Sequence, residues 1–463
     1  MKTKARKYQK QGIRLIEHRF NGRVLLADEM GLGKTFQSLK VMQRNKRTML
    51  PAVVICPAPL KWNWSDEAAK HIGMAAEVLE GTKPQQQNWR SHNLLIINYE
   101  ILGPWMEFLQ ELNPQLIIMD EVHRIKSRSA QCTKHCQELC KGVPNIFALS
   151  GTPLTNEPSE LFTTLNILWP KEFNSFWTFA QRYTHAEMKR WGWQFKGAKN
   201  LPELHERLLN LGMLRRRKVD VLKELPGRTV TVLPQPLSKP KMKEYQKAQN
   251  DFINWLSKRS KHKAHKAMKA QRLVKIGYLR RLAAELKLPD VIKWVDNYLE
   301  ESDEKLLIFG IHRDILGPLF KRYSSRSVLI DGQVTGKQRH TRVLEFRKRA
   351  DKQIAICNIR AGGVGINMPE ATNVLFVELP WTPADLDQAI SRAHRMGQTR
   401  GVMVHILVAQ NTIEERLCQV LQDKQSIADA VLDGGSDEMT RLNIFDQLEM
   451  ELTRDKPNLT TVS

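Results

Sequence analysis

Short apolar runs alternate with amphipathic stretches in the first 150 residues of this chain. The apolar run at 24–27 is followed by a helix-like segment at 35–43 and by a second apolar run at 53–56. This alternation predicts strands joined by helices, and hence a mostly parallel sheet with helices on both faces. We therefore expect an α/β lobe in this part of the chain.

The same alternation returns in the second half of the sequence. A helix-like segment at 290–301 precedes five apolar runs that we interpret as strands, at 306–310, 327–330, 354–357, 374–378 and 402–407. Between the two regions the pattern breaks into a Trp-rich stretch, an extended segment and a basic stretch. We therefore predict a first lobe over 1–236 with a helical protrusion at about 158–215, a basic helical linker over 237–287, a second lobe over 288–434 and a short tail over 435–463.

Composition supports several domains and adds an argument from charge. A chain of 463 residues is too long for one ordinary core, and its 72 Lys and Arg against 49 Asp and Glu give a net charge of +23. That excess favours a polyanionic partner, although charge alone does not choose between nucleic acid and acidic lipid. No apolar run approaches the roughly 20 residues that a bilayer needs, and none follows the basic start, so we expect neither a membrane span nor a secretory signal.

About half of the excess positive charge lies in one segment. Residues 239–287 contain fifteen Lys and Arg and three acidic residues. The segment is either a surface that binds a polyanion or a solvated helix face, and we favour the first interpretation.

The six cysteines show none of the paired spacings that are typical of zinc sites, which fits a reducing compartment. Cys132, Cys136 and Cys140 recur every four residues. They form either a row of metal ligands or a row of small side chains that pack inward, and we favour packing.

A glycine-rich turn at 28–35, with the sequence DEMGLGKT, follows the first apolar run and opens the first helix-like segment. A turn in this position directs backbone N–H groups at phosphates. Lys34 would neutralise the β- and γ-phosphates of ATP, and the Thr35 hydroxyl would bind Mg²⁺. Asp28 stands where the strict phosphate-loop pattern has glycine. The predicted nucleotide-binding residues here are Asp28, Glu29, Met30, Gly31, Leu32, Gly33, Lys34 and Thr35.

Two carboxylates end a later apolar run at 116–120. Asp120 would hold the Mg²⁺ ion and Glu121 would polarise the attacking water. Two carboxylates after an apolar run are common by chance. Their position roughly 85 residues after the glycine-rich turn, within one α/β lobe, is what makes this pair a specific signal of a nucleotide-hydrolysing site.

Two further segments would complete a catalytic site. The turn at 150–153 carries two hydroxyls that could sense the γ-phosphate, although by itself it would pass as an ordinary turn. Arg392 and Arg395 are three residues apart, on one face of a helical turn, where they either stabilise charge on phosphates or form a basic surface turn.

Together these blocks resemble the Swi/Snf-type DNA translocases of helicase superfamily two, over essentially the whole chain. The resemblance implies an α/β fold with two RecA-like lobes, plus helical insertions, that holds ATP and Mg²⁺. It makes DEMGLGKT the usual first motif and implies catalytic roles for Lys34, Asp120, Glu121, Arg392 and Arg395. It adds nucleotide contacts by Gln9, Gly365 and Gln388. Gln398 stands where RNA helicases usually carry Arg and is similar to the DNA-translocating branch.

The resemblance also implies the DNA contacts. Those in the motifs are Asn63, Trp64, Asn98, Tyr99, Thr152, Asp331, Gly332, Gly362, Gly363 and Trp381. Those in the basic segment are Lys258, Arg259, Lys261 and Lys263.

Within the superfamily, the blocks at 182–183, 191–193, 200–204 and 214–221 are similar to the HepA-related annealing helicases. The sequence begins almost at Gln9, so we expect a minimal motor without the HARP module of that subfamily.

The leading hypothesis is an ATP-dependent translocase on double-stranded or branched DNA. A strand-separating helicase of replication or repair would need a pin, and the sequence does not locate one. An ATP-gated clamp would not need Glu121 and both arginines, and a small-molecule enzyme would leave the second lobe unexplained. We expect an intracellular, DNA-associated monomer that meets replication or repair proteins.

Overall fold

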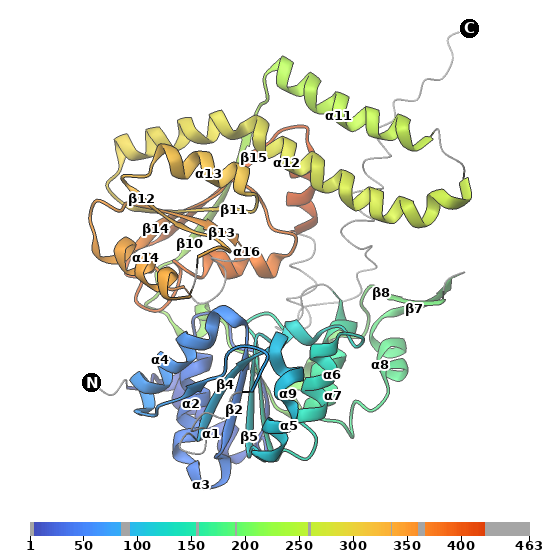
Figure 1. Ribbon diagram of the computed structural model, residues 1–463, viewed down its shortest axis with the longest axis vertical. Coiled ribbons are helices and arrows are strands. Elements are labelled where there is room, and N and C mark those ends of the chain that lie inside the picture. Colours follow the sequence, from blue (N-terminus) through green and yellow to red (C-terminus); the bar gives the residue numbers. More distant parts are fainter. Residues whose placement is uncertain are drawn as a thin grey trace. The chain divides into compact units, whose positions relative to one another are not determined.

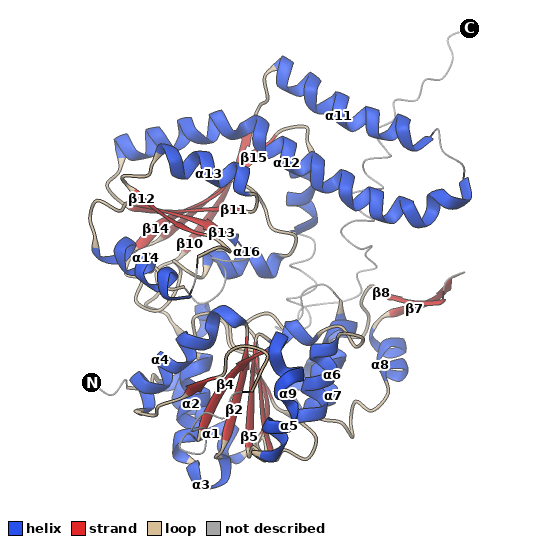
Figure 2. Cartoon of the chain, viewed as in Figure 1, coloured by secondary structure: helices blue, strands red, loops and turns tan. Residues whose placement is uncertain are grey.

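The computed structural model describes residues 4–84, 93–153, 157–189, 192–257, 261–334, 336–359 and 366–421. The chain divides into two compact units, the first ending at Leu225 and the second beginning at Pro226. Each unit contains one parallel sheet covered by helices (Figures 1 and 2). The predicted α/β fold with two parallel sheets is confirmed.

Unit 1 contains a seven-stranded sheet in the order β3-β4-β2-β5-β6-β1-β9, with every pairing parallel. Its strands are β1 (Arg23–Leu26), β2 (Ala52–Cys56), β3 (Glu77–Val78), β4 (Leu94–Asn98), β5 (Leu116–Asp120), β6 (Asn145–Leu149) and β9 (Met213–Leu214). The central strands β2, β4 and β5 are buried along their whole length, which is why they read as unbroken apolar runs. Because β5, β6, β1 and β9 are neighbours, the segments that follow them meet at one edge of the sheet.

The helices of unit 1 connect these parallel strands and cover the sheet. They are α1 (Lys7–His18), α2 (Lys34–Arg44), α3 (Lys46–Met49), α4 (Lys61–Ile72), α5 (Leu102–Glu111), α6 (Gln131–Leu139), α7 (Phe162–Leu168), α8 (Phe176–Tyr183), α9 (Leu201–Leu211) and α10 (Lys218–Val221). Cys136 and Cys140 are buried in the core and Cys132 packs against it, as the packing interpretation predicted. The described residues contain no group of three or more His, Cys, Asp or Glu side chains that could hold a metal ion.

The predicted helical protrusion at about 158–215 is only partly helical. Besides α7, α8 and α9 it contains a hairpin of β7 (His185–Lys189) and β8 (Gly192–Lys196), and it ends in β9 of the sheet. The hairpin follows from a period of two in the apolar positions, which fits strands and not helices.

Unit 2 contains a six-stranded sheet in the order β10-β15-β14-β11-β13-β12, again with every pairing parallel. Its strands are β10 (Arg228–Gln235), β11 (Lys305–Gly310), β12 (Ser327–Ile330), β13 (Ile354–Asn358), β14 (Ala371–Phe376) and β15 (Val402–Ala409). The five predicted strands are all present. β10 pairs with β15 along its full length, so the predicted end of the first lobe at 236 is wrong.

The basic segment is part of unit 2 and not a separate linker. It forms α11 (Lys239–Ser257) and the first part of α12 (Lys261–Glu301), which crosses the predicted boundary at 287 without a break. Three of its cations, Lys275, Arg280 and Lys287, are buried. Part of the positive charge counted in the sequence therefore lies in the protein interior.

The other helices of unit 2 are α13 (Arg313–Arg322), α14 (Gly336–Lys348) and α16 (Pro383–Ile390). The predicted tail over 435–463 lies outside the described residues. None of the described helices combines the length and the apolar composition that a membrane span requires.

Candidate nucleotide-binding and catalytic site

Three predicted motifs of unit 1 meet where neighbouring parallel strands end. The glycine-rich loop follows β1, Ser150 follows β6, and Asp120 is the last residue of β5. The loop and the turn after β6 approach closely, since a Cβ atom on Gly151 would lie 2.4 Å from Cγ of Met30 and 3.2 Å from Nζ of Lys34. The sheet order thus assembles what the sequence presents as separate motifs.

The glycine-rich loop has the backbone that a phosphate cradle needs. Gly31 and Gly33 have φ values of 89° and 78°, in the left-handed region that favours glycine. Gly33 directly precedes α2, whose first N–H groups have no partner within the helix. Nζ of Lys34 donates to the Asp28 carbonyl at 2.8 Å, which holds the ammonium group over the loop.

Asp120 and Glu121 are both buried beside this loop. Glu121 has a left-handed φ of 55°, and its carboxylate accepts a hydrogen bond from the Ser150 hydroxyl at 3.4 Å. Burial, and after it the nearby Glu121 carboxylate, raise the pKa of Asp120 to about 7. Burial lowers the pKa of Lys34, although the surrounding carboxylates act in the opposite direction. The two buried carboxylates, and the Thr35 hydroxyl near the start of α2, are hard oxygen donors of the kind that suits Mg²⁺.

Trp64 and Tyr99 hold Asp120 in place. Trp64 is fully buried on α4, and its indole N–H donates to Oδ2 of Asp120 at 2.8 Å. The buried Tyr99 hydroxyl donates to the Asp120 carbonyl at 2.8 Å. Neither ring reaches the surface, so neither ring is available for the predicted DNA contacts, which stay predictions for these two positions.

Three other predicted DNA contacts of unit 1 lie in the described residues, and they differ in burial. Asn98 is buried and its amide donates to the Glu100 carboxylate at 2.8 Å. Asn63 and Thr152 are half-buried, so their DNA roles stay predictions.

An arginine that follows β9 braces the glycine-rich loop, a role that sequence reasoning missed. Arg216 forms an ion pair with the fully buried Asp28 and donates to Oε1 of Gln37 at 2.7 Å. Arg215 donates to the carbonyls of Ala27 at 2.9 Å and Gly151 at 3.1 Å. Arg216 thereby explains why an aspartate stands at the first position of the loop.

Lys218 completes this brace. Its backbone N–H donates to Oε2 of Glu29 at 2.7 Å, and its Nζ lies 3.5 Å from Oε1 of the same residue. The signal in the sequence is the basic run at 215–218, within the block at 214–221 that marks the subfamily. Its meaning depends on β9 pairing with β1, a contact between residues far apart in the chain.

Gln9 also contacts the loop. Its amide donates to the Leu32 carbonyl at 3.2 Å, and the neighbouring Tyr8 hydroxyl donates to the same oxygen at 3.1 Å. Gln9 thus fixes α1 to the loop, and its predicted reading of adenine stays a prediction.

In unit 2, the predicted arginines follow α16. Arg392 is buried, and its guanidinium donates to the carbonyls of Gln388 at 3.0 Å and Ile366 at 3.1 Å. Arg395 is half-buried one turn further on. Gln398, the branch marker, is buried and donates to two backbone carbonyls, so its amide has a structural role here.

Three predicted DNA contacts of unit 2 can be placed. Asp331 is buried and accepts from Nη2 of Arg313 at 2.5 Å, whereas Gly332 beside it is exposed. Trp381 is half-buried, with the Arg280 guanidinium 4.3 Å from its ring centre. The predicted residues Gly362, Gly363, Gly365, Lys258 and Arg259, and the side chains of Lys261 and Lys263, lie outside the described part of the chain.

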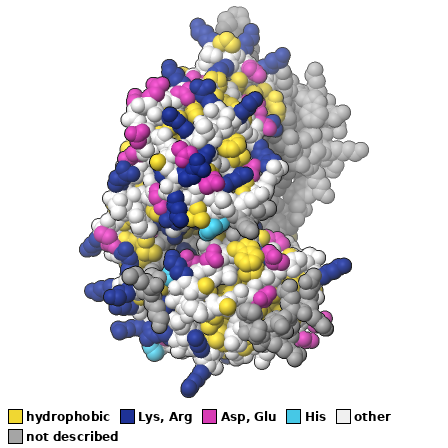
Figure 3. Space-filling model, turned by 60° about the vertical axis from the view of Figure 1, so that its left-hand side comes forward, with side chains coloured by type: hydrophobic (Ala, Val, Ile, Leu, Met, Phe, Trp, Pro, Cys, Tyr) yellow, Lys and Arg dark blue, Asp and Glu magenta, His cyan; other side chains and the backbone are white. Residues whose placement is uncertain are grey.

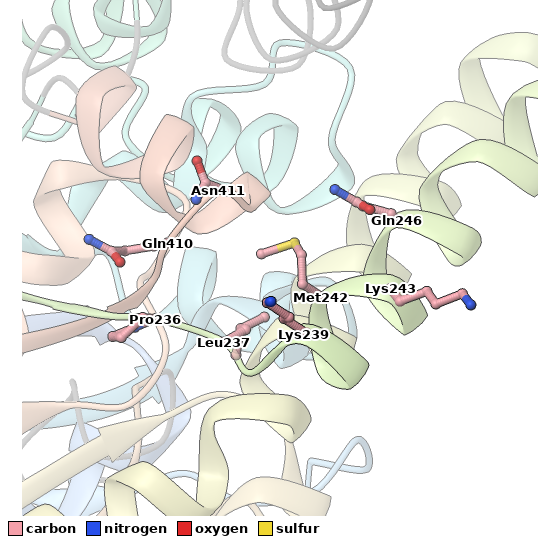
Figure 4. A pocket seen from close by; sticks show the side chains of 8 residues that line it. All are labelled: Pro236, Leu237, Lys239, Met242, Lys243, Gln246, Gln410 and Asn411. Atoms are coloured by element: carbon pink, nitrogen blue, oxygen red, sulfur yellow. The ribbon is translucent and has the colours of Figure 1, made fainter.

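A pocket of about 350 Å³ lies elsewhere in unit 2, where α11 begins and β15 ends (Figure 4). It is lined by Pro236, Leu237, Lys239, Met242, Lys243, Gln246, Gln410 and Asn411. None of the predicted site residues lines it, so it is separate from the motifs described above.

A phosphate-type loop, a buried carboxylate pair and two parallel α/β sheets define a protein of the P-loop nucleotide-binding class. Family models make this more specific, because the SNF2-related domain matches residues 8–288 and the helicase conserved C-terminal domain matches residues 287–397. The chain belongs to the SNF2-related family, which confirms the resemblance seen in the sequence.

Curated relatives agree with this family. The chain is 31% identical over 454 residues to the mouse DNA annealing helicase and endonuclease ZRANB3, an alignment that covers 95% of this chain and 42% of the mouse protein. It is 31% identical over 432 residues to a Caenorhabditis elegans homologue of SWI/SNF-related matrix-associated actin-dependent regulator of chromatin subfamily A-like protein 1, covering 91% and 61% of the two chains. The chain therefore spans about half the length of these relatives.

Among solved structures, the SWI2/SNF2 ATPase core of Sulfolobus solfataricus in complex with dsDNA matches with a TM-score of 0.45 and 23% identity. That match covers 100% of this chain and 98% of the other.

Proposed function

We propose that this chain is an ATP-driven motor that moves along double-stranded DNA. The observation that supports it best is the buried Asp120–Glu121 pair beside the Lys34 loop. A protein that only bound nucleotide would not need a second carboxylate held by Ser150 in a left-handed turn.

The residues present fit ATP and Mg²⁺. The triphosphate would bind the N–H groups at the start of α2 and the Lys34 ammonium, while Thr35 and Asp120 would hold the metal. Bound Mg²⁺ neutralises charge on the phosphate oxygens. Glu121 would accept a hydrogen bond from the attacking water and orient it, with Ser150 fixing the carboxylate. The catalytic roles of Arg392 and Arg395 stay predictions from the resemblance.

DNA is the polyanion that we propose as the track. The relatives named above are described as an annealing helicase and as chromatin-related proteins, and the net charge of +23 fits a nucleic-acid partner. On the face shown in Figure 3, Lys and Arg are spread over both units and mixed with Asp and Glu. Dispersed cations suit contacts to phosphates, which carry no sequence information, so sequence preference should be slight.

The proposal is tested by ATP hydrolysis of the full chain with and without duplex DNA. We expect duplex to stimulate hydrolysis, and we expect Glu121→Gln to retain ATP binding while losing turnover by several orders of magnitude. Glu138→Gln is the matched control, because Glu138 is an exposed carboxylate on α6 that pairs only locally with Lys141. Wild-type turnover in Glu121→Gln would remove its catalytic role, and absence of stimulation by duplex would contradict the motor.

A displacement assay separates the motor from its alternatives. A motor on duplex should remove a third strand annealed to the duplex without first separating the two strands. A strand-separating helicase would release single strands instead, and a clamp would bind without displacing anything.

A further inference from the structure

The hairpin of β7 and β8 has one apolar face. Ala186 lies opposite Phe195 and Met188 lies opposite Trp193, so these four side chains share one side of the two-stranded sheet. In Figure 1 the hairpin extends from α8, away from the sheet of unit 1. A two-stranded hairpin is marginally stable by itself, so this apolar face needs a support.

Aromatic side chains of α8 supply that support. The ring centres of Phe176 and Phe195 are 5.0 Å apart, and those of Trp177 and Trp193 are 4.5 Å apart. Phe176 also packs against Phe162, whose ring belongs to the core of unit 1, at 5.3 Å. The phenylalanine pair therefore anchors the hairpin to the unit.

The tryptophans are much more exposed than an anchor requires. Trp177 is 38% exposed, Trp193 is 46% exposed and Met188 is 68% exposed, whereas Phe176 and Phe195 are half-buried. The two indole rings meet edge to face at 80°, an arrangement that leaves ring surface open to solvent. Trp177 and Trp193 are in contact and both exposed, and contiguous exposed apolar surface is typical of places where another molecule binds.

The charge of this segment of the sequence indicates what that molecule is. Between Phe176 and Asn200 the sequence carries five Lys and Arg and one acidic residue, Glu187, and one of the five, Arg182, forms an ion pair with Glu203. The Arg128 guanidinium lies 3.3 Å from the ring centre of Phe176. Cations interleaved with exposed aromatic rings suit nucleic acid whose bases are free to stack, because bases inside a duplex already stack on each other.

We propose that the aromatic platform, formed by Trp177 and Trp193, stacks on unpaired bases of DNA beside a duplex, as at a fork. The proposal rests on the proposed function, because it takes DNA as the substrate and adds the part of it that this surface contacts. The proposal explains why the indoles of Trp177 on α8 and Trp193 on β8 are exposed, although Phe176 and Phe195 already anchor the hairpin.

The test measures binding of the full chain to a blunt duplex and to the same duplex with two unpaired tails. Trp193→Leu keeps an apolar side chain but loses the aromatic face, whereas Trp193→Phe keeps an aromatic face. We expect Trp193→Leu and Trp177→Leu each to lower the ratio of fork affinity to duplex affinity by about five- to 100-fold, the range for losing one base–aromatic stack. Trp193→Phe should recover most of that ratio.

Leu209→Ala is the matched control, because Leu209 on α9 of the same unit is also 38% exposed and is not aromatic. It should leave the ratio unchanged. An unchanged ratio in both leucine variants would overturn the platform. An equal loss of affinity for the blunt duplex and for the fork would also overturn it, because the tryptophans would then contribute to DNA binding in general or bind a partner other than unpaired bases. If the wild-type chain shows duplex-stimulated hydrolysis in either case, the proposed function stands although the platform does not.

Discussion

Trp64→Phe tests whether this tryptophan positions Asp120, the carboxylate that we propose binds the metal. Its indole N–H donates to Oδ2 of Asp120 at 2.8 Å, and the ring is fully buried on α4. Phenylalanine keeps an aromatic ring at this position and removes the donor. The Glu121 backbone N–H also donates to the Asp120 carboxylate, at 3.0 Å.

The magnitude follows from the charge of the acceptor. A hydrogen bond to a charged group contributes about 1.5–3 kcal/mol, and here it favours the ionised carboxylate. Burial and Glu121 already raise the pKa of Asp120 to about 7. Without the Trp64 donor the pKa rises further, so a larger fraction of Asp120 is protonated at neutral pH and cannot bind a cation. Loss of a group that orients a metal ligand typically lowers metal affinity or activity by about 10- to 100-fold.

The assay is the rate of ATP hydrolysis as a function of Mg²⁺ concentration. Trp64→Phe should need about 10- to 100-fold more Mg²⁺ for half-maximal rate, and a higher pH should partly restore the rate. Trp62→Phe is the control, because Trp62 lies two residues earlier on α4 and is 53% exposed. An unchanged Mg²⁺ requirement would refute the reasoning, and a loss confined to DNA affinity would return Trp64 to its predicted role as a DNA contact.

Three further changes test other parts of the structure. Arg216→Lys keeps the positive charge but loses the forked guanidinium that bonds to both Asp28 and Gln37, so the affinity for ATP should fall about tenfold in a nucleotide titration. An ATP affinity equal to that of the wild type would contradict the role of Arg216 in holding the loop. Lys287→Met leaves the buried Glu414 without its partner at 2.5 Å, so chemical denaturation should show unit 2 destabilised by about 3–5 kcal/mol. Adding Glu414→Leu should recover most of this loss, and full stability of the single variant would show that the pair is not structural. Reversal of the basic residues at 258, 259, 261 and 263 to Glu should make the dependence of DNA affinity on salt shallower, since each phosphate contact contributes roughly −0.9 to that slope; an unchanged slope would leave the segment a solvated helix.

The motifs of unit 1 were predictable because each depends on neighbours in the sequence. A buried strand of a parallel sheet is a short apolar run, and the residues after it lie at the carboxyl edge of the sheet. Lys34, Asp120 and Ser150 all follow such runs, so their local pattern was enough to place them together. The same reasoning located the strands of unit 2.

Positions whose role depends on a distant partner were not predictable. β10 reads as an isolated extended segment, because its partner β15 lies far along the chain. In the sequence Lys287 adds to the positive charge of the basic segment, whereas in the structure it is buried and forms an ion pair with Glu414. Trp64 matched a DNA-contact motif, yet burial turned its one polar atom toward Asp120.

The sequence by itself determined the α/β class, the two lobes and the position of the glycine-rich loop after the first strand, because these follow from periodicity and from motifs of a few adjacent residues. Only the tertiary structure decided which basic and aromatic side chains are buried. It turned Arg216 and Trp64 toward carboxylates and left Trp177 and Trp193 exposed. Burial depends on what packs over a residue, and in this protein the covering element comes from elsewhere in the chain.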